Sequence, residues 1–76
     1  DLSSYVGSYA STELECIWNV SFKNNRLVLS NQKIKEIKLK HSSADKFGFI
    51  EFLRDDSGNV MKLLLSGEGI EFLKIK

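Results

Sequence analysis

The chain has 76 residues, which leaves room for one domain with a modest hydrophobic core. Its formal net charge of +1 provides no long-range field that would attract nucleic acid or a membrane surface. The single cysteine, Cys16, excludes an internal disulfide and a cysteine-rich zinc site. Without any run of 18 apolar residues, the sequence also predicts no membrane insertion. Because the chain lacks both an initial Met and a signal peptide, we expect a piece of a longer protein.

The first part of the chain is predicted to form a short helical turn and two strands. The turn is expected at residues 2–5, and Gly7 allows a bulge or a close backbone approach in the strand that follows. Residues 11–13 are typical of a loop. Residues 15–23 alternate between apolar and polar side chains, apart from Ile17, which indicates a half-buried strand. Its buried face is expected to carry Cys16, Trp18, Val20 and Phe22.

A tight turn at Asn24 and Asn25 should reverse the chain into a partner strand over residues 26–30. Asparagine accepts the left-handed backbone conformation that a type I′ turn requires. The partner strand directs Leu27 and Leu29 to the same core.

Residues 33–41 are predicted to be extended, although their pattern is less regular. The spacing of Ile34 and Ile37 indicates either a bulge near Lys35 and Glu36 or two short strands joined there. A helix is the competing interpretation, but no pair of capping residues brackets the segment. Residues 42–45 are predicted to be a loop.

The strongest local pattern is a hairpin over residues 47–66, with its turn at residues 55–59. Val60, Leu63 and Leu65 can all face inward if a bulge lies near Met61 and Lys62. A further turn at residues 67–69 leads to a last strand over residues 70–76. Seven or so strands joined by short turns predict an all-β fold. We expect a small antiparallel meander that closes into a lipocalin-like barrel or a strongly curved sheet.

Several motifs of the chain occur in an order that resembles a known domain family. They are Tyr5-Val6-Gly7-Ser8-Tyr9, the hairpin around Asn24-Asn25-Arg26-Leu27, and Phe52-Leu53-Arg54-Asp55-Asp56-Ser57-Gly58. In this order they resemble the lipocalin-like β domain found at the C-terminus of serine hydrolases of the β-lactamase and penicillin-binding-protein family. The resemblance covers nearly the whole chain, but turns and their flanking strands specify a fold and not a reaction.

The resemblance implies a single accessory domain over residues 1–76 of a bacterial protein that works in the periplasm or outside the cell. The catalytic Ser-x-x-Lys motif of the family belongs to the hydrolase domain, and we expect it to be missing from this chain. The resemblance therefore implies no catalytic residue, no metal and no cofactor here. It implies instead that the domain contacts the catalytic domain of its parent protein and influences access to the active site, stability or oligomerisation.

The residues that could carry chemistry have simpler interpretations. His41 has Ser42, Ser43 and Asp45 close in sequence, but loop neighbours seldom converge as a catalytic triad, so an ordinary strand-end residue is expected. Cys16 lies on the apolar face and is expected to be buried. Residues 55–59 offer oxygen ligands without the spacing of an EF-hand, which favours a plain turn over a calcium site.

Two larger sets of residues allow alternatives. Lys33, Lys35, Lys38 and Lys40 are interrupted by Glu36 and lack interleaved aromatic residues, so they indicate an edge-protecting strand and not a nucleic-acid surface. Six of the aromatic residues could fill a barrel or line a cavity for a small ligand, and filling is the favoured outcome. They are Tyr5, Tyr9, Trp18, Phe47, Phe49 and Phe52.

A contact surface is the remaining hypothesis for function. Alternation turns Ile17, Phe49 and Leu53 away from the predicted core, so these three residues are candidates for an exposed apolar patch. The partner could be the parent's catalytic domain or a second copy of the chain. A small-ligand-binding β-barrel module is the alternative function.

Overall fold

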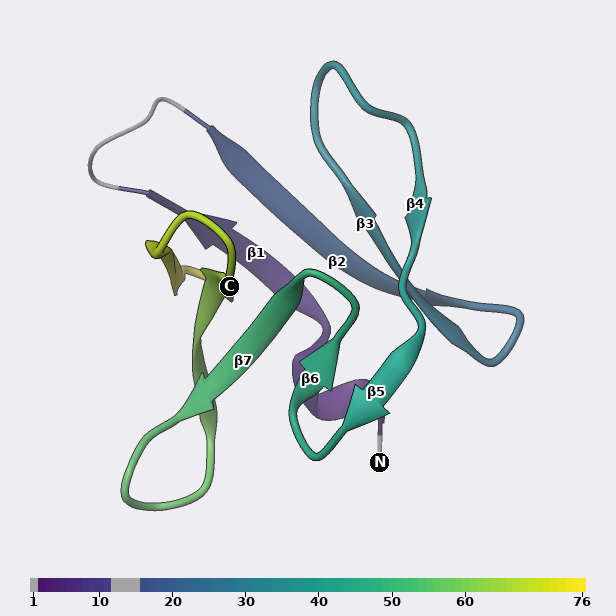
Figure 1. Ribbon diagram of the computed structural model, residues 1–76. Helices are drawn as coiled ribbons and strands as arrows, with labels where there is room; N and C mark the ends of the chain where they lie inside the picture. The colour runs from purple at the N-terminus through teal and green to yellow at the C-terminus, as the bar shows by residue number, and fades with distance from the viewer. Residues whose placement is uncertain (1, 12–15) are drawn as a thin grey trace.

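The fold is all-β, as the sequence predicts. A computed structural model describes residues 2–11 and 16–76, and these residues form one antiparallel sheet (Figure 1). A 3-10 turn, η1 (Leu2–Tyr5), precedes the nine described strands. The strands are β1 (Gly7–Ala10), β2 (Ile17–Lys23), β3 (Arg26–Ser30), β4 (Ile37–Lys38), β5 (His41–Ser43), β6 (Lys46–Phe47), β7 (Ile50–Arg54), β8 (Val60–Leu65) and β9 (Ile70–Lys74).

The sheet curls strongly, and the chain itself joins its two edges. The strand order is β4-β3-β2-β1-β9-β8-β7-β6-β5, so β4 and β5 form opposite edges although they follow one another in sequence. Only Leu39 and Lys40 separate them, and the Leu39 amide donates a hydrogen bond to the Leu27 carbonyl at 2.9 Å. Figure 1 shows the chain passing directly from β4 to β5. The expected strongly curved sheet is confirmed, in the form of a half-barrel.

The concave face of the sheet holds a core rich in aromatic side chains. Phe52 lies among Tyr5, Tyr9 and Phe47, with ring centroids 4.6, 5.8 and 5.7 Å away. Aromatic rings at such separations attract one another beyond the area that they bury. The core cluster consists of Tyr5, Tyr9, Trp18, Val20, Leu27, Leu29, Leu39, Phe47, Ile50, Phe52, Val60, Leu63 and Phe72. Five of the six aromatic residues expected to fill the interior belong to this core, whereas Phe49 is 47% exposed, which contradicts its expected burial.

The β2–β3 hairpin has the predicted turn. Asn24 and Asn25 have φ angles of 53° and 62°, in the left-handed region that a type I′ turn requires. Leu27 and Leu29 are buried as predicted, but Phe22 is 50% exposed, which contradicts its predicted burial. The pairing of β1 with β2 stops at Gly7 and Val20, so the end of β2 that carries Phe22 extends beyond its neighbour.

The β7–β8 hairpin also forms where the sequence places it. Leu53 pairs with Lys62, and Arg54 pairs with Val60. Met61 is thus the extra residue of a β-bulge, which allows both Val60 and Leu63 to face the core. The predicted bulge near Met61 and Lys62 is confirmed.

The segment between β3 and β5 differs from the prediction. Residues 33–36 are not a strand, because the Asn31 side chain accepts hydrogen bonds from the backbone amides of Lys33 and Ile34 at 2.9 and 2.7 Å. Such a side-chain contact competes with sheet pairing and stabilises a loop. Pairing with β3 begins only at Ile37. In turn, Ser42 and Ser43, predicted as loop, belong to β5.

Candidate functional site

A row of side chains crosses five strands on the outer face of the sheet. In register, Ile17 pairs with Ala10, Ala10 with Leu73, Leu73 with Lys62, and Lys62 with Leu53. Directly paired residues of a sheet lie side by side on one face. This outer row therefore consists of Ile17, Ala10, Leu73, Lys62 and Leu53, and four of the five are apolar.

The apolar members of the outer row are accessible to a partner. Ile17 is 49% exposed, Leu73 is 42% exposed and Leu53 is half-buried. Ile75, which is 53% exposed, donates its backbone amide to the Ser8 carbonyl at 2.8 Å and so continues β9 beside β1. Lys62 does not leave a free charge in the row, because its ammonium lies 3.2 Å from the Glu71 carboxylate. The row thus presents an accessible strip of mainly apolar surface.

The predicted patch is only partly brought together. Ile17 and Leu53 lie at the two ends of the outer row. Phe49 is 47% exposed but lies in the β6–β7 turn, four residues from Leu53 along the chain, with Glu51 between them on the same face. Sequence alternation identified Ile17 and Leu53, whereas Leu73 was missed because strand register decides that it lies between them.

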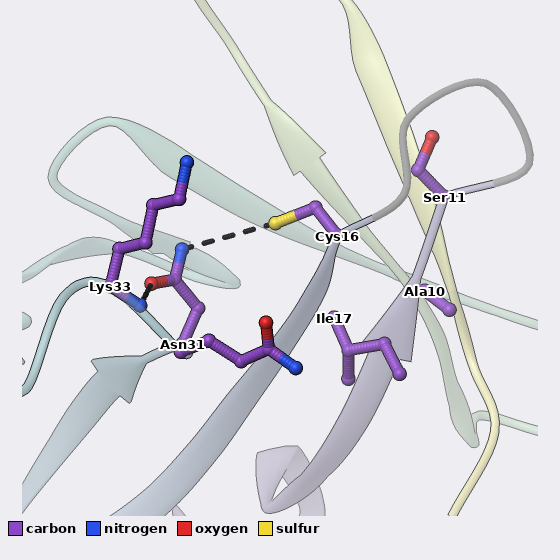
Figure 2. A pocket seen from close by; sticks show the side chains of 7 residues that line it. Ala10, Ser11, Cys16, Ile17, Asn31 and Lys33 are labelled. Atoms are coloured by element: carbon purple, nitrogen blue, oxygen red, sulfur yellow. Dashed lines mark hydrogen bonds between the residues drawn. The ribbon is translucent and has the colours of Figure 1, made fainter.

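A cleft of about 630 Å³ opens beside one end of the outer row (Figure 2). Ala10 and Ile17 belong to both features, and the remaining lining residues are Ser11, Cys16, Asn31, Gln32 and Lys33. Figure 2 shows the Asn31 side chain pointing toward Cys16, and its amide nitrogen lies 3.8 Å from the Cys16 sulfur. Cys16 is half-buried, less than predicted, and its sulfur accepts a hydrogen bond from the Asn31 side-chain amide.

A polar cluster joins three distant parts of the chain at the edge of the core. The Tyr5 hydroxyl donates a hydrogen bond to an Asp45 carboxylate oxygen at 2.6 Å. The Arg54 guanidinium contacts the same carboxylate at 3.1 Å and also donates to the Tyr5 hydroxyl at 3.2 Å. It further donates to the Gly58 carbonyl at 2.7 Å, which fixes the turn between β7 and β8. We call Tyr5, Asp45 and Arg54 the tyrosine cluster.

The charges of the tyrosine cluster shift its titration. Hydrogen bonds from Arg54 and then from Tyr5 hold the pKa of Asp45 below its usual value. Burial, followed by the hydrogen bond to Asp45, raises the pKa of Tyr5. Each shift favours the proton arrangement that the cluster already has: an ionised aspartate beside a neutral tyrosine. The cluster is a fixed structural connection and offers no group ready to transfer a proton.

His41 does not assemble a catalytic triad with its neighbours. Its Nε2 atom lies 2.8 Å from the Ala44 carbonyl oxygen, and its ring contacts Phe47 at a centroid distance of 4.9 Å. The Ser42 hydroxyl accepts a hydrogen bond from the Gly48 amide instead. His41 is the first residue of β5. The interpretation as a strand-end residue fits this geometry.

The expected absence of the Ser-x-x-Lys spacing is wrong. The spacing occurs twice, from Ser30 to Lys33 and from Ser43 to Lys46. On a helix this spacing places the two side chains on one face. Ser30 instead ends β3, and Ser43 pairs with Lys46 across the β5–β6 turn. Neither pair thus has the helical arrangement, and the spacing alone specifies no nucleophile.

In the turn at residues 55–59, the Asp55 carboxylate bonds to the backbone of the turn itself. The Asp55 carboxylate accepts hydrogen bonds from the Ser57 and Asn59 amides, each at 2.9 Å. The backbone amide of Asn59, followed by that of Ser57, keeps the pKa of Asp55 below its usual value. Over residues 2–11 and 16–76, no group of three His, Cys, Asp or Glu side chains has the arrangement of a metal site.

Comparisons with family models, curated proteins and solved structures find no match for this chain. Within the described part of the chain, no helix is long and apolar enough to cross a membrane. The site is therefore interpreted from its own geometry. Among the described residues, the outer row forms an accessible and mainly apolar strip that crosses five neighbouring strands.

Proposed function

We propose that this chain is a non-catalytic accessory domain of a serine hydrolase of the β-lactamase type, working outside the cytoplasm. In this proposal the outer row packs on the parent's catalytic domain and influences its stability or the access to its active site. Removing apolar side chains from water would drive that contact, at about 25 cal/mol for each Å² of apolar surface buried.

The outer row carries the proposal. Ile17 and Leu73 are each about half accessible and lie one strand apart, on either side of Ala10. Isolated exposed apolar residues are common on proteins, but a row that spans neighbouring strands is typical of an interface. Lys62 lies within the row, between Leu73 and Leu53, and the Glu71 carboxylate pairs its charge at 3.2 Å, so no unpaired cation interrupts the row.

Residues of two motifs behind the family resemblance lie at positions where the fold depends on them. Gly7 lies where a side chain would overlap the Lys76 carbonyl oxygen, so this glycine allows the N- and C-terminal strands to lie together. Arg54 and Gly58 contact one another in the β7–β8 turn. These positions explain why such residues would recur in a domain of this architecture, and they support the family proposal at the level of fold.

The proposal is tested in two steps. The coding sequence upstream of Asp1 should contain a Ser-x-x-Lys motif on a predicted helix. Single cysteines are then placed at Leu73 and, as a control outside the outer row, at Ser57 in the β7–β8 turn, both in a Cys16→Ser background. Labelling with a thiol reagent is then compared between the 76-residue chain and the longer polypeptide in which this chain follows the upstream catalytic domain.

We expect the Leu73→Cys thiol to react at least tenfold more slowly in the joined polypeptide, because the catalytic domain covers it. The Ser57→Cys thiol should react equally fast in both. An upstream sequence of another kind, or equal labelling of Leu73→Cys, would contradict the proposal. Slow labelling in the 76-residue chain alone, with sedimentation as a dimer, would support contact between copies instead.

A further inference from the structure

We propose that the opening between the two sheet edges binds a small carboxylate that carries a compact apolar group. This inference does not depend on the accessory-domain proposal. It rests on a cavity of about 460 Å³ between β3 on one side and β5 and β6 on the other. Pockets for small ligands commonly begin at about 300 Å³.

The base of the cavity is apolar. Tyr5, Leu27, Leu39 and Phe47 line it, and all four belong to the hydrophobic core. Leu2, from the N-terminal turn, packs against the same cluster. Because these core side chains expose only a few atoms each, the apolar part of a ligand should be short and compact.

The rim of the cavity is cationic. Arg26 and Lys40 both line it and are exposed, and His41 lies beside them. None of the described residues that line the cavity is acidic. The nearby Asp45 carboxylate is bound by Arg54 and Tyr5, so it does not neutralise the rim. Two cations above an apolar base complement a molecule with a carboxylate at one end and a hydrocarbon group at the other.

Closure of the sheet explains why the cavity lies at this place. The chain follows β3 as far as the hydrogen bond between Leu39 and Leu27 and then turns away to begin β5. Arg26 is thus left without a β4 partner, since the β3–β4 pairing covers only Val28 and Leu29. The two cations therefore lie at the point where the half-barrel stays open.

The test adds hexanoate, 1-hexanol or acetate to the isotope-labelled chain. Binding is measured from the changes in the amide chemical shifts. Hexanoate has both the charge and the apolar group, whereas each of the other probes lacks one. We expect hexanoate to shift the amide signals of residues 25–27, 39–41 and 44–47, and to bind roughly tenfold or more tightly than either control probe.

Two double variants distinguish binding in the cavity from nonspecific attraction of the hexanoate carboxylate to surface cations. Arg26→Gln with Lys40→Gln should weaken hexanoate binding to the level of 1-hexanol while the amide spectrum stays folded. Lys33→Gln with Lys35→Gln removes the same charge outside the cavity and should leave binding unchanged. Equal binding of hexanoate and 1-hexanol, shifts away from the cavity, or equal losses in both double variants would overturn the proposal.

Discussion

Single side chains hold together parts of this chain that are far apart in sequence. Tyr5 is the clearest example, because its hydroxyl bonds to Asp45 and Arg54 while its ring packs on Phe52. A second bond, from the Tyr9 hydroxyl to the Tyr5 carbonyl at 2.7 Å, fixes the N-terminal turn against the core. The tyrosine cluster thus connects η1, the β5–β6 turn and β7.

Asp45 should make the stability of the domain sensitive to acid. Its pKa is lowered in the folded chain by Arg54, so its stabilising contribution is complete above the unfolded pKa of about 3.9 and is lost as the pH falls through the lower folded value. We therefore expect Asp45→Asn to be less stable than the original chain at pH 7, with the difference shrinking below about pH 4. Urea unfolding, followed by Trp18 fluorescence at each pH, measures the stability of both the original chain and the variant. A difference that stays constant down to pH 2 would contradict this account.

Gly7 should tolerate no side chain. Its φ angle is 156°, and a Cβ atom would overlap the Lys76 carbonyl oxygen and approach the Lys74 side chain. We expect Gly7→Ala to lower the free energy of unfolding by about 1–3 kcal/mol, the usual cost of a strained backbone. Gly67→Ala is the matched control, because no atom lies within 4 Å of its added Cβ and its φ is not in the left-handed region. Equal effects of the two variants in urea unfolding would remove the steric argument.

Local sequence signals predicted the hairpins well and the middle of the chain poorly. The Asn24–Asn25 turn and the bulge at Met61 follow from residue preference and alternation, which act over a few neighbours. The spacing of Ile34 and Ile37 predicts extended structure over residues 33–41. The Asn31 side chain instead accepts hydrogen bonds from the Lys33 and Ile34 amides, and residues 33–36 stay out of the sheet. That competition depends on one side-chain conformation, which alternation cannot show.

The β5–β6 turn contains a residue that is poorly suited to its backbone conformation. Ala44 has a φ of 43°, and the left-handed region costs an ordinary residue about 1–2 kcal/mol. Glycine avoids this cost but loses about 0.5–1 kcal/mol through its greater freedom in the unfolded chain. We expect Ala44→Gly to raise the free energy of unfolding by roughly 0.5–1 kcal/mol.

Ala10→Gly in β1 provides the comparison for Ala44→Gly, because Ala10 has no positive φ angle. It should lower the free energy of unfolding by about 0.5–1 kcal/mol. Thermal unfolding followed by circular dichroism would show opposite shifts in midpoint for the two variants. A loss of stability in both would mean that the conformation of Ala44 carries no cost.

For the whole molecule, curvature of the sheet decides both the core and the candidate site. Alternation identified Ile17 and Leu53 as outward-facing, but only the strand order places β9 between β1 and β8 and thus sets Leu73 into the outer row. The cavity between the edges likewise depends on how far the sheet closes. These features arise from long-range pairing, for which a single sequence gives no local signal.

A domain of this size should depend heavily on its aromatic core. Phe52 is 1% exposed and contacts Tyr5, Tyr9 and Phe47, whereas Phe22 is 50% exposed. Truncation of a buried phenylalanine to alanine costs about 3–5 kcal/mol, which is comparable to the total stability of many small domains.

We expect Phe52→Ala to be largely unfolded at 25 °C, with collapsed amide dispersion and no near-ultraviolet circular dichroism. Phe52→Leu should cost less than Phe52→Ala and stay folded, because it removes fewer buried atoms and leaves a smaller cavity. Phe22→Ala removes the same atoms from an accessible position and should change stability by no more than about 0.5 kcal/mol. If Phe22→Ala proved as damaging as Phe52→Ala, the core would not lie on the concave face of the half-barrel.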